Sequence, residues 1–320
     1  MPEQTPRRTR LAPSPTGALH LGNARTFLAN YLLARQNHWQ ILLRIEDLDG
    51  PRIKSGADVQ AMEDLQWLGI AWDDGPSYQL PRLAKYQMAV DDLIARDLAY
   101  PCICTRKEVE LAASAPHAED GASIYPGTCR DRFDSMDEAR SLSGREPAIR
   151  FRVPDGTVSF TDAFSGAHQV DVAKDLGDFV IRKSDGTAAY QLAVVIDDAD
   201  AGITDVVRGD DLLDSTPRQI LLYHALDLTR LIPRYTHLPL VVGTDGRRLA
   251  KRHGDTRLSF YHELDSPASR VLSLLARWLK IPCDRQPSNA DELVGQFDLA
   301  NLSRDQIVFT SDDDAFLRRH

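Results

Sequence analysis

The stretch RLAPSPTGALHLGNARTFLANYLLARQNHWQILLRIED, residues 10–47, decides the fold class. Its first residues should be extended, because Pro13 and Pro15 are incompatible with a helix interior. Residues 16–37 predict a turn followed by an amphipathic helix, and the apolar run at 40–45 is typical of a buried strand. Strand, turn, helix and strand at this spacing predict a βαβ unit, so we expect an α/β fold with a parallel sheet. The expected apolar face of the helix is formed by Leu21, Phe27, Leu28, Tyr31 and Leu32.

The composition is that of a globular protein and narrows its possible roles. With 320 residues, 42% of them hydrophobic and 27% charged, the chain can form one large domain with appendages, or two domains. No apolar run follows the start MPEQTPRRTR, and QILLRI is too short to cross a bilayer, so we expect a cytoplasmic protein without membrane contact. The net charge of −9 argues against indiscriminate nucleic-acid binding. RNA contact would then need local basic patches, such as residues 7–10 and 247–253.

Two helices and an insertion should follow the βαβ unit. Residues 55–70 and 82–98 predict helices, with a turn at DDGPS, residues 73–77, between them. From Ala99 to Ala167 the composition of the sequence changes. This stretch contains cysteines, polar loops and short predicted strands separated by a Pro-Asp-Gly turn. We therefore expect an insertion between two halves of the sheet domain.

The chain after the insertion should return to the sheet domain. Residues 178–200 predict strand-like chain with a hairpin turn at Asp185 and Gly186. Residues 214–226 predict a helix that Ser215 or Thr216 caps. The end of the chain looks helical and polar. The expected division is 1–98 and 168–258 for the two halves of the sheet domain, 99–167 for the insertion and 259–320 for a small C-terminal helical segment.

The segment from Pro13 to Asn23 has the features of a nucleotide-binding turn. Gly17 and Gly22 let the backbone approach a ligand, and a helix that begins here offers free N–H groups to phosphate. His20, which we place one turn into the helix, can donate a hydrogen bond to phosphate oxygens during a reaction. An ordinary βα turn is the alternative interpretation.

A second candidate is the glycine-flanked basic segment from Asp245 to Gly254. Such a loop can close over a triphosphate, and Lys251 would neutralise the charge that grows on a leaving pyrophosphate. Taken alone, the segment favours a solvated surface loop.

Together the two segments resemble a known family. His20-Leu21-Gly22-Asn23 is similar to the His-Ile-Gly-His signature of class I aminoacyl-tRNA synthetases, and Arg248-Leu249-Ala250-Lys251-Arg252 to their Lys-Met-Ser-Lys-Ser loop. The following His253-Gly254, RLAPSPTG before the first motif and LLRIEDLD after it resemble the glutamate-specific members. The resemblance runs from about Arg10 to Leu258. It implies a ligase with a Rossmann-like class I aminoacyl-tRNA synthetase catalytic domain.

The resemblance also implies roles for individual residues. It implies catalysis by His20 and Lys251, and ATP binding with Mg²⁺ by His20, Gly22, Asn23, Arg248 and Lys251. The residues that it implies for glutamate are Arg10, Leu11, Ala12, Pro13, Ser14, Glu46, Tyr190 and Arg208. The planar guanidinium of Arg10 suits a carboxylate, and Glu46 suits an ammonium group. The alternatives are that Arg10 and Glu46 pair with each other and that Tyr190 packs in a hairpin.

Three cysteines, Cys102, Cys104 and Cys129, fall in one short stretch. In a reducing compartment such clustering indicates a metal more than a disulfide, and three thiolates bind zinc tetrahedrally if a fourth ligand exists. On chemical grounds His117 is the default fourth ligand. The pattern Cys-x-Cys and Tyr-x-x-x-Cys, however, resembles the structural zinc site of glutamyl-queuosine tRNA(Asp) synthetases, which implies Tyr125 and one Zn²⁺ per chain. The remaining alternative is three reduced, unligated cysteines.

The length after the basic loop favours the same branch of the family. Only residues 255–320 follow Gly254, so we expect no separate anticodon-binding domain of the glutamyl-tRNA synthetase type. The queuosine branch implies that glutamate is activated by ATP without RNA and transferred to the queuosine base in the anticodon loop of tRNA(Asp). The expected partners are ATP, L-glutamate and tRNA(Asp) carrying queuosine, and we expect a monomer. The alternatives are a truncated synthetase that charges a tRNA 3′ end and an inactive synthetase-like binding module.

Overall fold

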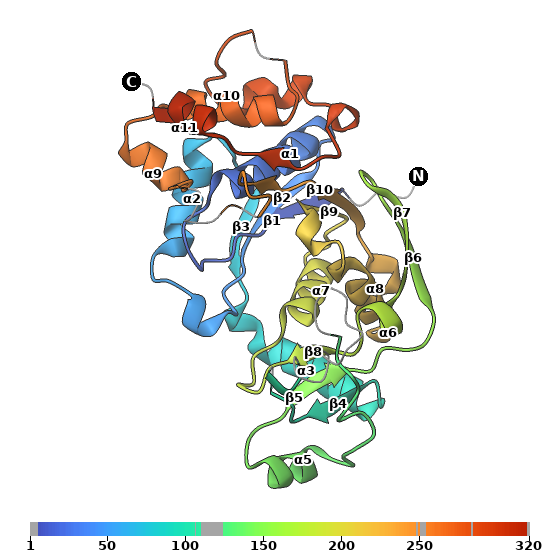
Figure 1. The fold of residues 1–320 in the computed structure, drawn as a ribbon. Coiled ribbons are helices and arrows are strands. Elements are labelled where there is room, and N and C mark those ends of the chain that lie inside the picture. The colour runs from blue at the N-terminus through green and yellow to red at the C-terminus, as the bar shows by residue number, and fades with distance from the viewer. Residues whose placement is uncertain are drawn as a thin grey trace.

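The predicted βαβ unit forms the centre of the N-terminal half (Figure 1). The computed structural model describes residues 6–105, 107–109, 124–247, 249, 254–282 and 284–318. In it, β1 (Arg8–Leu11) and β2 (Gln40–Ile45) are parallel neighbours connected by α1 (Leu21–Gln36). β3 (Asp74–Tyr78) pairs with the other side of β2, also in parallel. The predicted α/β fold with a parallel sheet is confirmed.

A second parallel pair extends this sheet. It consists of β9 (Asp205–Gly209) and β10 (Arg234–Leu238). The backbone N–H of Thr204, just before β9, donates to the carbonyl of Arg8 in β1 at 2.8 Å. The carboxyl ends of the parallel strands therefore meet at one edge, which is where open α/β sheets bind their ligands.

α1 is more deeply buried than its sequence predicts. Leu21, Leu28, Tyr31 and Leu32 lie in the main core as expected, but so do alanines from the other faces of the helix. The reason is that α1 is covered on a second side by α10 (Ala268–Trp278), which lies above it in Figure 1. Phe27, expected in the core, is only partly buried and lines a cavity.

The predicted turn at DDGPS is wrong, because most of it forms β3. Gly75 makes this pairing possible: it has a φ of 100°, and a Cβ at this position would lie 2.4 Å from the carbonyl oxygen of Leu43. Close backbone approach to β2 thus overrides the turn preference of the sequence. The two flanking helices are confirmed as α2 (Ala57–Trp67) and α3 (Leu83–Ala95).

A smaller antiparallel sheet lies at the opposite end of the molecule from α10 (Figure 1). Its strands are, in spatial order, β4 (Ala99–Cys102), β5 (Ala148–Phe151) and β8 (Phe179–Arg182). α5 (Met136–Ser143) lies beyond it. β6 (Thr157–Asp162) and β7 (Gly166–Asp171) form a separate hairpin, followed by α6 (Val172–Asp175).

The strand-like chain predicted for residues 178–200 is half wrong. The turn at Asp185 and Gly186 exists, since the N–H of Gly186 donates to the carbonyl of Lys183, but only β8 precedes it as a strand. The following residues form α7 (Tyr190–Asp200), a helix despite the β-branched run Val194-Val195-Ile196. Its residues 192–199 are all buried, so the helix is covered on every side. The next helix is confirmed as α8 (Ser215–Ala225), but it begins after Asp214 and has no side-chain cap.

The C-terminal segment is neither purely helical nor purely polar, which corrects the prediction. α10 contributes Val271, Leu272 and Leu275 to the same core as α1. A short strand, β12 (Ile307–Val308), pairs in parallel with β11 (Val241–Val242) of the sheet domain. The other helices of the segment are α9 (Leu258–Glu263) and α11 (Ser311–Arg318). Because its apolar side chains complete the main core, the segment is integral to the sheet domain.

The remaining short elements are 3₁₀ helices. They are η1 (Gly50–Arg52), η2 (Leu80–Arg82), η3 (Asp210–Leu212), η4 (Thr229–Leu231), η6 (Ala290–Gln296) and η7 (Leu299–Asn301). Within the described part of the chain, the helices are all too short or too polar to cross a membrane.

Candidate active site

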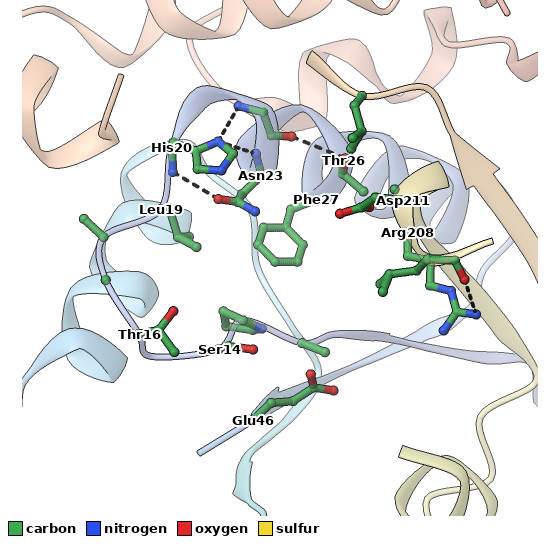
Figure 2. A pocket seen from close by; sticks show the side chains of 18 of the residues that line it. Ser14, Thr16, Leu19, His20, Asn23, Thr26, Phe27, Glu46, Arg208 and Asp211 are labelled. Carbon is green, nitrogen blue, oxygen red and sulfur yellow. Dashed lines mark hydrogen bonds between the residues drawn. The ribbon is translucent and has the colours of Figure 1, made fainter. Parts of the chain in front are cut away.

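A cavity of about 490 Å³ opens at the carboxyl ends of β1, β2 and β9 (Figure 2). Most of the residues predicted to bind glutamate or ATP line this one cavity. They are Arg10, Ala12, Pro13, Ser14, His20, Gly22, Asn23, Glu46, Tyr190 and Arg208. The fold therefore brings together predicted site residues that lie far apart in the sequence.

Strand alternation decides which residues of the first segment reach the cavity. Along β1 and the chain after it, Arg10, Ala12 and Ser14 share one side, as a period of two requires. Leu11 points the other way and is fully buried in the main core. Leu11 was predicted to contact glutamate, and its side chain is not positioned to do so.

His20 is the N-cap of α1, and not a residue one turn inside the helix as predicted. Its Nδ1 accepts hydrogen bonds from the backbone N–H groups of Gly22 (3.1 Å) and Asn23 (3.3 Å). Oδ1 of Asn23 accepts in return from the backbone N–H of His20 (3.3 Å), as Figure 2 shows. Because Nδ1 is an acceptor, a neutral His20 carries its proton on Nε2. The imidazole is thus fixed as a donor at the positive end of a helix.

The position of the His20 ring leaves little room for a side chain at residue 22, which is a glycine. A Cβ there would lie 3.0 Å from Cε1 of His20 and 3.5 Å from Cβ of Val241, which lines the same cavity. Any larger residue would push the imidazole out of its capping position.

Arg10 and Glu46 each pair with a partner inside the wall of the cavity. Nη2 of Arg44 donates to Glu46 at 3.0 Å, and Nε of Arg10 lies 3.5 Å from Asp198. Burial raises the pKa of Glu46 above its ordinary value, against the opposing effect of Arg44 and Arg10. Burial has the same tendency for Asp198, but Arg44 and Arg10 outweigh it and lower its pKa. The alternative that Arg10 and Glu46 pair with each other is not what the structure shows.

Arg10 has one buried donor that makes no hydrogen bond to any described residue. Its Nε is buried and has no hydrogen-bond partner among the described residues, although the side chain is only 4% exposed. A buried guanidinium without hydrogen bonds is costly, so an anion in the cavity would relieve that cost.

Arg208, at the end of β9, is held much more firmly. It donates to Nε2 of His237 (2.9 Å), to Gln219 (3.0 Å), to Thr216 (2.8 Å) and to the carbonyl of Leu212 (3.3 Å). A guanidinium has five N–H groups, so these described partners occupy four of them. The fixed cation faces the cavity with little freedom to reorient.

Hydrogen bonds of His237, one of the partners of Arg208, keep Arg208 in place. His237 must accept from Arg208 at Nε2, so its Nδ1–H donates to Asp162 (2.7 Å). Burial lowers the pKa of His237, which keeps the imidazole neutral and able to accept. Tyr190 is the first residue of α7, not part of a hairpin strand, and burial raises the pKa of its hydroxyl.

Several cavity residues were not singled out from the sequence. Thr26, Phe27 and Asp211 line the cavity, and Asp198 and Arg44 lie behind it. Arg44 had a usable signal, because a charged residue inside the apolar run QILLRI needs a buried partner. Asp198 had no such signal in the sequence, because only the packing of α7 on the sheet brings it close to Arg10.

The basic loop falls largely outside the described residues, including Arg248, Ala250 and Lys251. Its ends are nevertheless fixed beside the cavity. After the loop, the carbonyl of Thr256 accepts from the N–H of Leu21 (3.0 Å), and the N–H of Leu258 donates to the carbonyl of Leu19 (2.8 Å). Before it, Val241 lines the cavity. The loop therefore leaves and re-enters the fold next to His20.

The basic patch at residues 7–10 is neutralised within the fold. Arg7 forms an ion pair with Asp205, and Arg8 with Asp74. These side chains stabilise the sheet and leave little charge for RNA.

The three predicted cysteines form a compact cluster in the smaller sheet region. The sulfurs of Cys102, Cys104 and Cys129 all lie within 4.8 Å of one another. The hydroxyl oxygen of Tyr125 lies 3.4 Å from Sγ of Cys102 and 3.7 Å from Sγ of Cys104. Four ligands ~2.3 Å from a central ion would lie ~3.8 Å apart in a tetrahedron. The cluster could therefore hold a metal.

A cation stands beside the cluster. Nε of Arg150 donates to Sγ of Cys102 at 3.2 Å, and its guanidinium stacks 3.7 Å over the Tyr125 ring. It would balance the negative charge of a tetrahedral site rich in thiolates. His117, the other candidate ligand, lies outside the described residues.

Comparison with known proteins agrees with this geometry. The family model of the class I tRNA synthetases (E and Q), catalytic domain, matches residues 7–313. The glutamyl-Q tRNA(Asp) synthetase of Rhodopirellula baltica is 49% identical over 84% of this chain and 83% of its own length. The glutamate–tRNA ligase of Citrifermentans bemidjiense is 39% identical over 98% of this chain but 66% of its own length.

A solved structure repeats the same architecture. The crystal structure of a glutamate tRNA ligase from Elizabethkingia meningosepticum, in complex with its amino acid, superposes with a TM-score of 0.81. It is 28% identical, and the match covers 98% of this chain and 69% of that one. The chain therefore belongs to the class I tRNA synthetases of the glutamate and glutamine group, and within that group to the glutamyl-Q tRNA(Asp) synthetases.

Proposed function

We propose that the chain activates L-glutamate with ATP and transfers it to the queuosine base in the anticodon loop of tRNA(Asp). The observation that carries the first step is a single cavity bordered by both Arg10 and the N-terminus of α1. One region suits an amino acid with a carboxylate side chain, and the other suits phosphate. The name of the Rhodopirellula baltica relative supports the choice of RNA in the second step.

The charges of the cavity suit glutamate. Arg10 and Arg208 provide two cations for carboxylate oxygens, and Glu46 provides one anion for the α-ammonium group. Nε of Arg10 is held toward Asp198, so a bound carboxylate would meet the rest of the Arg10 guanidinium. Because these groups are fixed before binding, little conformational entropy is lost on glutamate binding.

The first chemical step needs positioning and charge stabilisation. The α-carboxylate of glutamate attacks the α-phosphorus of ATP, which forms glutamyl-adenylate and releases pyrophosphate. His20 Nε2–H would donate to a phosphate oxygen, and Lys251 with Arg248 would neutralise the departing pyrophosphate. Gly22 and Asn23 line the cavity at the start of α1 and would face the nucleotide there. Their backbone N–H groups already donate to Nδ1 of His20 and are not free as expected, so the positive end of the helix dipole would attract the phosphate. Mg²⁺ accompanying ATP would supply further charge neutralisation.

In the second step a hydroxyl of the queuosine base attacks the activated carbonyl. An ester forms between glutamate and the base, the bond to phosphate breaks, and AMP leaves with the electron pair. No enzyme nucleophile is required.

The cysteine cluster is proposed to bind one structural Zn²⁺ through Cys102, Cys104, Tyr125 and Cys129. The support is the donor set itself, since three sulfurs and one phenolic oxygen are already close to tetrahedral spacing. Bound zinc would hold β4 against the segment that carries Cys129.

Transfer of labelled glutamate to RNA tests the proposal. We expect label on tRNA(Asp) that carries queuosine, also after removal of its 3′-terminal adenosine, because the acceptor is the base. The same RNA from cells unable to make queuosine should remain unlabelled. Labelling of queuosine-free tRNA(Asp) to the same extent would contradict the proposal.

Charging of a tRNA 3′ end is the second candidate, favoured by the 39% identity to a glutamate–tRNA ligase. It predicts the opposite pattern, in which removal of the 3′-terminal adenosine abolishes labelling and the queuosine content has no effect. The two outcomes cannot both occur on the trimmed RNA, so one gel separates the candidates.

A further inference from the structure

Four buried charged side chains form a continuous chain behind the wall of the cavity. Arg10 and Glu46 line the cavity, and Asp198 and Arg44 connect them. Asp198 lies 3.5 Å from Nε of Arg10 and accepts a hydrogen bond from Nη1 of Arg44 at 2.5 Å. Nη2 of Arg44 then donates to Glu46 at 3.0 Å. The charges alternate along the chain, from the cation Arg10 to the anion Glu46.

Three different elements supply this chain of charges. In the register of β1 and β2, Arg10 lies opposite Leu42, so Arg44 and Glu46 project to the same face as Arg10. α7 covers this face and contributes Asp198. Asp198 is therefore the only link of the chain that comes from outside the two strands.

Removal of the Asp198 charge would leave Glu46 as the remaining anion of the chain beside two cations. All four side chains are buried, with Glu46 the most exposed at 9%, so water cannot take the place of the lost partner. Arg10 would then be drawn to Glu46. The two cavity groups of opposite charge would neutralise each other, and neither would be available to a ligand.

We propose that Asp198 is a positioning residue that keeps Arg10 and Glu46 apart, so that each binds a different charged group of the amino acid. The inference rests on the glutamate site proposed above. It assigns selection of a zwitterionic substrate partly to a residue that does not touch it.

The neighbouring Asp197 provides a matched control. It is also a buried aspartate of α7, but its carboxylate hydrogen-bonds to other partners. Its carboxylate accepts hydrogen bonds from Gln79 (2.7 Å), Arg82 (2.6 Å) and Tyr86 (2.8 Å), which lie in and around α3. Loss of this charge should affect packing of α7 and not the cavity.

The test compares Asp198→Asn with Asp197→Asn in the full chain by glutamate-dependent ATP–pyrophosphate exchange. For Asp198→Asn we expect the KM for glutamate to rise about 10- to 100-fold, with kcat and the KM for ATP within about threefold. Asp197→Asn should lower the melting temperature yet keep the KM for glutamate within about threefold. An unchanged KM in Asp198→Asn, or equal increases in both variants, would overturn the inference.

A double-mutant cycle tests the same point through Glu46. If Asp198 acts by keeping Glu46 available, adding Asp198→Asn to Glu46→Gln should raise the KM for glutamate much less than it does in the wild type. Fully additive effects would overturn the inference.

Should Asp198→Asn fail to fold, Arg44→Gln breaks the same chain at its next link and must raise the KM for glutamate but not for ATP. A wild-type protein inactive with glutamate would instead refute the proposed function.

Discussion

The glutamate end of the cavity and the cysteine cluster differ in how their polar groups are held before any ligand binds. In the cavity, Arg208 makes four hydrogen bonds and Asp198 holds two arginines, so the protein supplies its own counter-charges. In the cluster, three sulfurs and the Tyr125 oxygen mainly face one another. Thiols are weak hydrogen-bond partners. The first site is thus organised by folding, whereas we propose that a metal completes the second.

This difference predicts opposite consequences of substitution. Changes at the glutamate end should alter substrate binding more than folding, because the surrounding core remains intact. Changes in the cluster should alter folding of the smaller sheet region more than chemistry, because the cavity does not include it.

Arg10→Met should have the largest effect at the glutamate end. Loss of a buried cation that faces a carboxylate should lower kcat/KM for glutamate by on the order of 10²–10⁴ in ATP–pyrophosphate exchange. Arg7→Met is the control, since Arg7 comes just before β1, pairs with Asp205 and does not line the cavity. Similar losses in both variants would mean that Arg10 serves the sheet and not the substrate.

Lys251→Ala should reduce the rate of exchange by on the order of 10²–10³ and leave the KM for glutamate little changed. The lysine would act only as pyrophosphate leaves, so ground-state binding of glutamate does not depend on it. Arg247→Ala, an exposed neighbour at the edge of the loop, should be close to wild type. Near wild-type exchange by Lys251→Ala would remove this residue from the mechanism.

Cys129→Ser should separate the two sites most clearly. We expect metal analysis to find close to one zinc per chain in the wild type and none in this variant, with a lower melting temperature. Exchange at a temperature where the variant is folded should fall by less than about tenfold. Cys283→Ser is the control, because Cys283 is the one cysteine of the sequence that is not part of the predicted cluster, and this variant should keep its zinc. If the wild type contains no metal and chelators do not change its melting temperature, the three cysteines are ordinary thiols and the cluster does not bind zinc.

We expect the smallest effect for Asp162, which supports Arg208 through His237. Burial opposes ionisation of Asp162, but hydrogen bonds from His237 and from two backbone N–H groups outweigh it and lower its pKa to about 2. A carboxyl group with a lowered pKa in the folded state adds stability above its unfolded pKa, and this is lost as the pH falls.

Between about pH 4 and pH 2, the wild type should therefore lose about 2 kcal/mol of unfolding free energy that Asp162→Asn does not lose. Denaturant unfolding at both pH values measures the difference. Equal pH slopes for the two proteins would show that the Asp162 pKa is not lowered.

The sequence predicts the βαβ unit and much of the cavity because both depend on local pattern. Arg10, Ala12 and Ser14 are predicted from the family resemblance of their segment, and strand alternation explains why they line the cavity. The start of α1 is predicted from its glycines. The predictions fail where distant segments decide the outcome. β3 forms because β2 lies beside it, which the local sequence does not reveal. The sequence of α7 wrongly predicts a strand because Val194-Val195-Ile196 is β-branched. Asp198 could not be found, because its partners come from β1 and β2.

We propose that one cavity joins a glutamate site to a nucleotide site and activates glutamate without RNA. ATP–pyrophosphate exchange in the absence of RNA, with glutamate, glutamine and aspartate compared, tests it most directly. We predict rapid exchange with glutamate and, because the cavity cations would face an uncharged amide, at least tenfold slower exchange with glutamine at the same concentration. No exchange with glutamate unless tRNA is added, or equal exchange with glutamine, would contradict this account.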